Sequence, residues 1–165
     1  MSEGTDPRPL VVVGVDGSRD ADAALHHAVA EARRRHGRVL AVAACDVPPW
    51  SAVDVESLPT DPEAVRHGAE VRARRHVEEL LATAGDVPVT VVGRLGRPTR
   101  VLVDEARDAA LLVVGHRGRG AFRSAALGSV GLGCLLHARC PVTVVRPPAR
   151  ADAGGTTPAR AEVAR

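Results

Sequence analysis

The sequence predicts an α/β fold in which a parallel sheet is covered by helices on both faces. Residues 10–15 (LVVVGV) and 110–114 (ALLVV) are continuous apolar runs, typical of strands buried on both faces. Between and around them, segments with apolar residues at helical spacing alternate with further apolar runs, which is typical of βαβ units. Right-handed crossovers then place helices on both sides of the sheet.

Length and composition indicate one domain with a core of small aliphatic side chains. The chain has 165 residues, of which 45% are hydrophobic and only 1% aromatic. Trp50 and Phe122 are the only aromatic residues, which excludes the stacking platforms that bind single-stranded nucleic acid. All basic side chains other than histidine are arginine, so a catalytic or Schiff-base lysine is also excluded.

Net charge and the search for targeting signals limit the classes of binding partner and the cellular compartment that we expect. A net charge of +2 favours neither a nucleic-acid nor a membrane partner. No apolar run reaches spanning length and no signal peptide is visible, so we expect a cytoplasmic protein. Cys45, Cys134 and Cys140 fit no zinc spacing and are expected to be buried or half-buried thiols in a reducing compartment.

The expected elements follow from apolar spacing and turn residues. In chain order they are strand 10–15, helix 21–32, strand 39–45, a proline-rich connection over 46–62, helix 62–84, strand 87–92, helix 96–106, strand 110–114, helix 129–137 and strand 142–145. Ser18 or Asp20 is expected to cap the first helix, and Gly37 to stop it. The alternating Arg and Glu residues of helix 62–84 predict a solvated face.

The glycine-bearing loop after strand 110–114 is the strongest functional signal. Gly115 and Gly118 lack a Cβ, so their backbone can take positive φ and approach a phosphate closely. Gly128 and Ser129 then begin a helix, where bare N–H groups and the helix dipole favour an anion. Taken singly, each feature also fits a tight turn or an N-cap without ligand; at this spacing they favour a phosphate site.

A second loop, after strand 10–15, carries a carboxylate. Asp16 could accept hydrogen bonds from ribose hydroxyls or an adenine amine, or could simply form the turn with Gly17. Ligands of such sheets bind beyond the carboxyl ends of the strands. If strands 10–15 and 110–114 are neighbours, both loops open into one crevice. Arginines 117, 119 and 123, with Arg117 foremost, could neutralise phosphates there or remain solvated.

Three segments together resemble the universal stress protein family in its single-domain, ATP-binding form. They are Gly115-x2-Gly118-x9-Gly128-Ser129, the opening Val12-Val13-Gly14-Val15-Asp16-Gly17-Ser18 and the ending Cys140-Pro141-Val142-Thr143-Val144-Val145. The resemblance covers residues 9–147, leaving residues 1–8 as a flexible N-terminus and 148–165 as a disordered tail. It implies a Rossmann-like sheet in the order 3-2-1-4-5, ATP with or without a divalent metal such as Mg²⁺, and a homodimer through the C-terminal strand.

The resemblance also assigns roles by position. It places Asp16 on the adenosine, Gly14 and Val15 beside it, Ala44 against the adenine, Val114 and Gly115 along the ribose and phosphates, and Gly118, Gly128, Ser129 and Val130 on the phosphates. The sequence departs from the family at His116, where many members carry Ser. Gly131 and Gly133 are expected to weaken the last helix, because each costs roughly 1 kcal/mol against Ala.

We therefore expect an ATP-binding regulatory protein of the stress response with little or no turnover, at most weak ATP hydrolysis. The chain has no GxxxxGK[ST] motif, no lysine and no evident acid pair beside the glycine loop. Nucleotide binding would shift the loop from Arg119 to Leu127, or the dimer surface. The alternative is a dimeric interaction module of the same fold that no longer binds nucleotide. A nucleotidyl transferase or ATP pyrophosphatase would need a catalytic constellation that the sequence lacks. The sequence names neither the stress nor a downstream protein partner.

Overall fold

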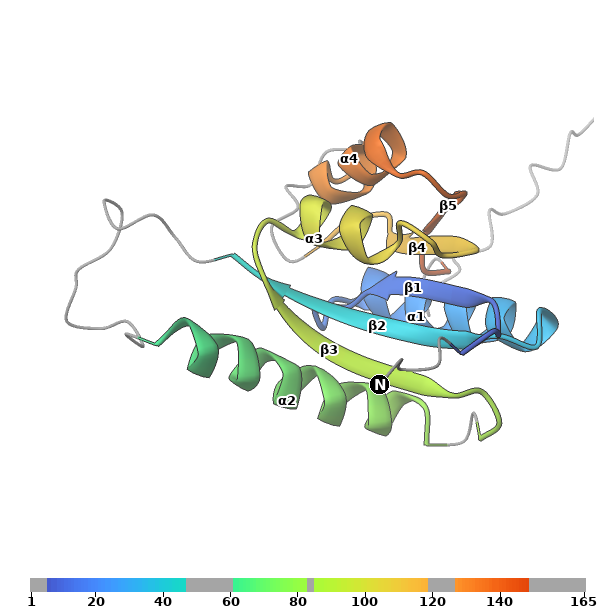
Figure 1. Cartoon of the computed structure of the whole chain (residues 1–165), viewed down its shortest axis with the longest axis horizontal. Helices are drawn as coiled ribbons and strands as arrows, with labels where there is room; N and C mark the ends of the chain where they lie inside the picture. The colour runs from blue at the N-terminus through green and yellow to red at the C-terminus, as the bar shows by residue number, and fades with distance from the viewer. Residues whose placement is uncertain (1–5, 47–60, 83–84, 119–126, 149–165) are drawn as a thin grey trace, which may run out of the picture.

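Five parallel strands form one sheet in the order β3-β2-β1-β4-β5, in a computed structural model that describes residues 6–46, 61–82, 85–118 and 127–148 (Figure 1). The elements are β1 (Leu10–Gly14), α1 (Arg19–Arg34), β2 (Arg38–Cys45), α2 (Pro62–Leu80), β3 (Val89–Leu95), α3 (Pro98–Glu105), β4 (Leu111–Gly115), α4 (Ser129–His137) and β5 (Val142–Val145). The expected sheet and its order are confirmed. Its winding reverses between β1 and β4.

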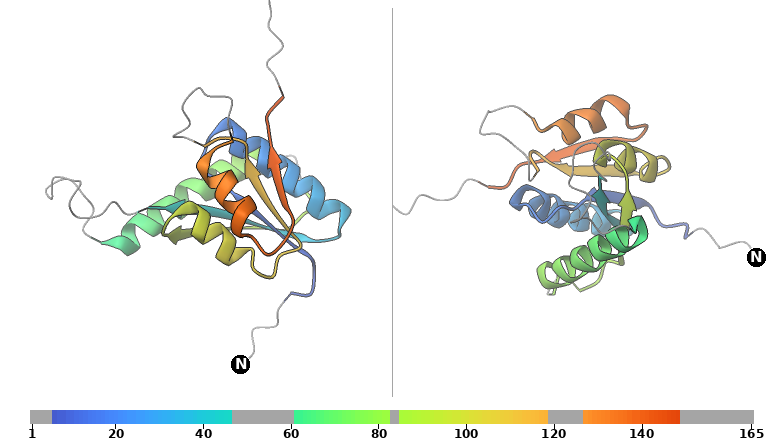
Figure 2. Two further views of the ribbon diagram at one scale, coloured as in Figure 1. Left: turned by 90° about the horizontal axis from the view of Figure 1, so that it is seen from above. Right: turned by 90° about the vertical axis from the view of Figure 1, so that its left-hand side faces the viewer.

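The central strand explains why the apolar runs are continuous. In β1, Val11, Val12 and Val13 are fully buried, because helices cover both faces of the sheet. α1 and α2 lie on one face and α3 and α4 on the other (Figure 2). Leu25 of α1 belongs to the first core, and Leu102 of α3 to the second.

The two ends of α1 show how the chain enters and leaves a helix. Ser18 is the N-cap, since its Oγ accepts a hydrogen bond from the Ala21 N–H at 3.2 Å. At the other end Gly37 was expected to stop the helix, but His36 takes the left-handed conformation with φ 52°. Gly37 is needed for a different reason: a Cβ there would lie 2.3 Å from the Pro9 carbonyl oxygen.

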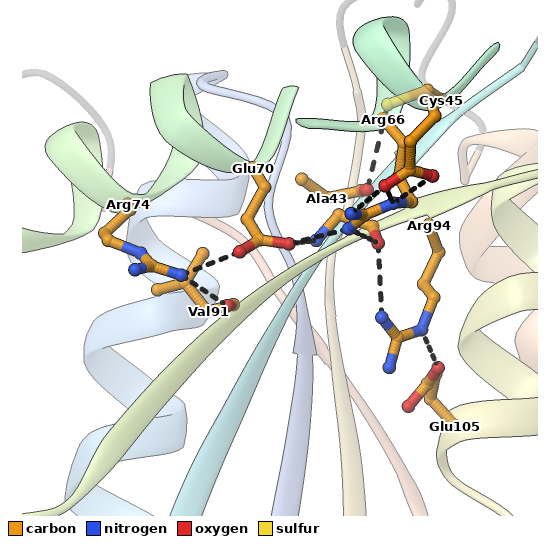
Figure 3. A network of polar contacts seen from close by, with 10 residues as sticks. Ala43, Cys45, Arg66, Glu70, Arg74, Val91, Arg94 and Glu105 are labelled. Atoms are coloured by element: carbon orange, nitrogen blue, oxygen red, sulfur yellow. Dashed lines mark hydrogen bonds and ion pairs between the residues drawn. The ribbon is translucent and has the colours of Figure 1, made fainter. Parts of the chain in front are cut away.

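The α2–β3 unit differs most from expectation. α2 begins after the Asp61 cap and ends at Leu80, and β3 runs to Leu95 instead of ending at residue 92. The helix face expected to be solvated contacts this strand: Glu70 Oε2 accepts the Gly93 N–H at 3.0 Å (Figure 3). Because β2 stays paired with β3 as far as Cys45 opposite Leu95, the strand continues through a glycine that the sequence pattern treats as a boundary.

The glycines of α4 have a packing role that the sequence did not indicate. A Cβ at position 133 would lie 2.6 Å from Thr99 Cγ2 of α3, and one at position 131 would lie 3.0 Å from Leu127 Cδ1. The helix spans residues 129–137 as expected. Its glycines allow close approach to neighbouring side chains.

Several expectations fall outside the described residues. They concern most of the 46–62 connection with Trp50, the loop residues Arg119 and Arg123, and the segment 149–165. The expected burial of the cysteines is confirmed: Cys134 is fully buried, Cys45 and Cys140 are half-buried, and all three are free thiols. Burial raises the pKa of the Cys134 thiol to about 11. Within the described ranges, no helix combines the length and apolar character needed to cross a membrane.

Candidate functional site

The carboxyl ends of three neighbouring strands bring the expected site residues to one edge of the sheet. β1 and β4 pair with Val13 opposite Val113, so Asp16 and Gly115 lie at the carboxyl ends of adjacent strands. β2 lies on the other side of β1 with Val42 opposite Gly14, so Ala44 lies two residues beyond that pair, towards the same edge of the sheet. The expectation that both loops open at one reversal point of the sheet is met.

The glycines of the loop lie against one another and against Asp16. A Cβ at Gly118 would stand 2.9 Å from Asp16 Oδ2. A Cβ at Gly128 would stand 3.3 Å from the His116 carbonyl oxygen and 3.9 Å from the Gly118 nitrogen. Segments that are far apart in the sequence, the β1–α1 turn and the start of α4, therefore both contact the loop after β4.

The reason glycine is needed in this loop differs from the expected one. Neither Gly115 nor Gly118 takes a positive φ; the positive-φ glycines among the described residues are Gly17, Gly85 and Gly96. Gly115 is required by close packing, since its Cβ would lie 2.8 Å from the Asp20 carbonyl carbon. The expectation that these glycines take a positive φ was wrong. The expectation of close approach holds, but the atoms that approach the glycine are the protein's own.

The start of α4 has the features of an anion site. Gly128 is the N-cap, with extended φ and ψ of −62° and 153°, and none of the described side chains caps the helix. Ser129, the first helical residue, is exposed. The first N–H groups of a helix have no partner within it, and the positive end of the dipole adds to their attraction for an anion.

Part of the loop is already hydrogen-bonded within the protein, which corrects the picture of bare amides. The His116 N–H donates to the Val145 carbonyl at 2.7 Å, and the Gly128 N–H donates to the His116 carbonyl at 2.9 Å. The Arg117 N–H donates to Asp20 Oδ2 at 3.0 Å. An anion site at this edge therefore depends more on the start of α4 than on the amides of residues 116 and 117.

Asp16 is both the turn-forming residue and an exposed carboxylate. Its Oδ1 accepts the Ser18 N–H at 2.9 Å, which holds the turn before α1, and Gly17 completes that turn with φ 74°. Its Oδ2 is the atom that faces Gly118. The two interpretations of Asp16 are compatible, because the turn fixes the carboxylate against Gly118 of the loop after β4.

The remaining expected residues differ in what they can present. The side chains of Val15 and Val114 are buried in the cores on opposite faces of the sheet, so these residues can offer only main-chain atoms to a ligand. Ala44, Arg117 and Val130 are half-buried at the same edge. Gly14 lies under α3, where a Cβ would contact Leu102 Cδ1 at 3.0 Å.

Asp20 is the residue that sequence reasoning missed. No acid pair beside the loop was evident, yet Asp16 and Asp20 both reach it, one against Gly118 and the other on the Arg117 amide. Their spacing of four residues across the start of α1 was the available signal. Over the described part of the chain, no three His, Cys, Asp or Glu side chains gather in a way that could hold a metal ion.

The segment after β5 contacts arginine or histidine side chains at two places near this edge. The Arg146 guanidinium lies 2.9 Å from His116 Nε2, and Arg19 Nη2 donates to the Pro148 carbonyl at 2.9 Å. A groove between α2 and β3, lined by residues such as Val77 and Val89, contains none of the expected site residues.

Known proteins match this chain over most of its length. A family model described as "Universal stress protein family" matches residues 9–146. Universal stress protein Rv2005c of Mycobacterium tuberculosis is 40% identical over 137 residues, which cover 82% of this chain and 45% of that protein. Rv2623 of the same organism is 37% identical over 137 residues, covering 82% and 44%. The chain therefore spans about half the length of these curated relatives.

Solved structures share the fold at lower identity. The universal stress protein UspA from Lactobacillus plantarum has a TM-score of 0.66 at 24% identity, covering 84% of this chain and 98% of that one. A universal stress protein in complex with cAMP has a TM-score of 0.61 at 23% identity, covering 86% and 98%. A family protein from Arabidopsis thaliana with AMP bound has a TM-score of 0.57 at 20% identity, covering 86% and 93%.

The fold, the three sequence segments and the match over residues 9–146 agree. This chain belongs to the universal stress protein family.

Proposed function

We propose that this chain is an adenine-nucleotide-binding regulatory protein of the stress response, with ATP as its ligand and little or no turnover. The observation that carries the proposal is the convergence of Asp16, Gly118 and Gly128 at the reversal point between β1 and β4. A carboxylate at one end and an uncapped helix N-terminus at the other suit the adenosine and phosphate ends of a nucleotide. Structural neighbours in complex with cAMP and with AMP support the ligand class.

The proposal of minimal catalysis rests on the absence of a phosphate-binding lysine and of a P-loop motif in the sequence. Phosphoryl transfer depends on positioned cations and a placed nucleophile, and the chain has no lysine and no GxxxxGK[ST] motif. A divalent metal such as Mg²⁺ would be carried by the phosphates themselves, since the described residues gather no three His, Cys, Asp or Glu side chains that could hold it. A cytoplasmic location is proposed because nucleotide is available there and free thiols such as Cys45 persist in a reducing compartment.

Calorimetric titration tests the proposal. Wild type is titrated with ATP, AMP and cAMP, with and without Mg²⁺, and ATP hydrolysis is followed in parallel. We expect ATP binding with turnover at background, and a loss of affinity of about tenfold or more in Asp16→Ala, the size of one charge-assisted hydrogen bond. Asp104→Ala, which removes an exposed carboxylate of α3, is the matched control.

Two results would decide against the proposal. Substantial hydrolysis would make the protein an enzyme. An unchanged melting temperature at millimolar ATP would favour the alternative, a dimeric interaction module without nucleotide, because a ligand that binds only the native state must raise that temperature.

We also propose that the protein forms a homodimer through β5. The two edges of the sheet differ: on β3, Glu70 accepts the Gly93 N–H, and Arg74 Nη2 lies 3.5 Å from the Val91 carbonyl (Figure 3). No described residue covers the outer edge of β5 in this way. Beside β5, α4 exposes three leucines, Leu132 (49%), Leu135 (48%) and Leu136 (69%). An open edge beside exposed apolar side chains is suited to a second copy of the chain.

A further inference from the structure

The carboxylate of Asp20 holds a main-chain N–H of the phosphate loop. Its Oδ2 accepts the Arg117 N–H at 3.0 Å, a contact between residues 97 positions apart. Arg117 lies between the first two glycines of the signature, so the bonded amide is within the segment proposed to face the nucleotide phosphates. The Asp20 carboxylate is therefore a negative charge of the protein itself, placed where the negative phosphates are proposed to bind.

The contact is fixed by the backbone on both sides. Asp20 lies in the first turn of α1, whose start is held by the Ser18 cap. The loop can approach this turn only because residue 115 is glycine, where a Cβ would lie 2.8 Å from the Asp20 carbonyl carbon. Withdrawal of the Asp20 side chain from the loop therefore requires breaking its hydrogen bond to the Arg117 N–H.

The other charged groups at this edge set the local balance. Asp16 adds a second negative charge beside Gly118. Arg146 is engaged with His116, and Arg19 donates to the Pro148 carbonyl. Arg117 contributes a guanidinium from the loop itself. The negative charge of Asp20 is thus placed directly on the loop, where its effect on a bound ligand grows with the ligand's own negative charge.

Resting on the proposed function, we infer that Asp20 is a specificity-determining residue that disfavours the more highly charged nucleotides. The negative charge of the nucleotide increases from cAMP to AMP to ATP, while the adenosine part is the same in all three. Asp20 therefore sets the ratio of ATP to AMP affinity, and it also positions the loop by holding the Arg117 amide.

Two substitutions separate these roles. Asp20→Asn removes the charge and keeps an oxygen that can accept the Arg117 N–H; Asp20→Ala removes both. Asp22→Asn is the matched control, because it removes the same charge from the first turn of α1, but from a carboxylate that contacts His76 Nε2 of α2 at 2.7 Å. Affinities for ATP, AMP and cAMP are measured by calorimetry at low ionic strength with a chelator present.

Asp20→Asn is expected to raise the ATP-to-AMP affinity ratio by about threefold or more, the effect of one unit charge over roughly 10 Å near a protein surface. Asp22→Asn should leave the ratio within error, and the difference should shrink as salt is added. A purely structural role would change the affinities for both nucleotides without changing their ratio. Hydrogen exchange of the Arg117 amide in nucleotide-free protein should accelerate in Asp20→Ala and not in Asp22→Ala.

The outcomes distinguish the two proposals. If wild type binds nucleotide and Asp20→Asn keeps its ratio, or Asp22→Asn changes it equally, the inference about Asp20 is overturned and the proposed function stands. If Asp20→Asn binds ATP while wild type binds only AMP or cAMP, the inference about Asp20 is supported and ATP as the ligand of the wild-type protein is overturned. If neither protein binds any of the nucleotides, the proposed function fails and the selectivity assigned to Asp20 fails with it.

Discussion

Gly133 of α4 lies against Thr99 of α3 so closely that a Cβ at position 133 would stand 2.6 Å from Thr99 Cγ2 and 2.8 Å from its Oγ1. Glycine in a helix interior costs about 1 kcal/mol relative to alanine. Here that cost is offset by close packing of the two helices that cover the α3–α4 face of the sheet. Threonine is stiff at χ1, so its side chain cannot easily yield.

Gly133→Ala should therefore destabilise the protein, although alanine is the better helix former. The added methyl overpacks the α3–α4 contact, and we expect a loss of about 1–3 kcal/mol in the free energy of unfolding, measured by urea denaturation. Gly68→Ala in α2 is the control, because its Cβ would meet only the Arg72 guanidinium, at 3.2 Å. It should leave stability unchanged or raise it by up to about 1 kcal/mol. Partial recovery in Gly133→Ala/Thr99→Ala would identify the clash; equal effects of both glycine substitutions would argue against it.

Gly118→Ala should weaken nucleotide binding with little change in stability. Position 118 has no positive φ, so alanine is not strained there, but its Cβ would lie 2.9 Å from Asp16 Oδ2. The Asp16 carboxylate is held through its other oxygen by the Ser18 N–H and must shift. We expect ATP affinity to fall about tenfold by calorimetry, with Gly68→Ala retaining wild-type affinity. Equal affinity of Gly118→Ala and wild type would remove Gly118 from the site.

Much of this site was predictable, since local patterns fix which residues follow which strand. The apolar runs gave the strands, and the resemblance gave their order, which together place Asp16 and Gly115 at one edge. The Asp20–Arg117 contact was not predictable from spacing, because it joins the start of α1 to a loop 97 residues later. The contact depends on close backbone packing at Gly115. In the sequence nothing distinguishes this glycine from the others.

The β3 edge shows a second limit of pattern reasoning. Hydrophobic periodicity indicates which face of a helix or strand is apolar. Because Glu70 lies on the charged face of its helix, the pattern predicts that its side chain is solvated. It instead accepts a hydrogen bond from Gly93 of the edge strand. Long ionisable side chains of α2 can reach over the strand. The same charged side chains that predict an exposed helix face therefore cover the β3 edge.

The Glu70 contact should be visible in the acid stability of the protein. The hydrogen bond from the Gly93 N–H, together with the Arg66 and Arg74 guanidinium groups, holds the pKa of Glu70 below its ordinary 4.5. A carboxyl whose pKa is lowered on folding stabilises the native state above its unfolded pKa, and that stabilisation is lost as the pH falls through the folded value. The relevant window therefore lies below about pH 4.5.

Glu70→Gln should be less stable than wild type at pH 7, and its stability should fall less steeply below pH 4.5, so that the two proteins converge in acid. Urea denaturation at pH 7, 5, 4 and 3 measures the difference. Glu79→Gln, which removes an exposed carboxylate paired with Arg75 on the same helix, is the matched variant. Parallel stability curves for Glu70→Gln and wild type would show that Glu70 contributes no pH-dependent stability.

The homodimer proposed through β5 can be tested on the backbone of that strand. Pro141 and Val145 carbonyls accept hydrogen bonds from Leu112 and His116, so the odd-numbered residues of this segment face the β4 side. In a parallel ladder the residues between them direct their backbone groups to the other side. Val144→Pro therefore removes an N–H from the outer edge while sparing the bonds to β4.

Analytical ultracentrifugation should then find a dimer for wild type and a monomer for Val144→Pro. Leu135→Gln/Leu136→Gln, which makes the neighbouring α4 surface polar, should weaken the dimer without touching the strand. Val71→Gln replaces an apolar residue of similar exposure, 52%, on α2 beside the covered β3 edge, and should leave the dimer intact. If Val71→Gln dissociates the dimer and the α4 variant does not, the two copies meet at the β3 side, and the covering role assigned to Glu70 is wrong.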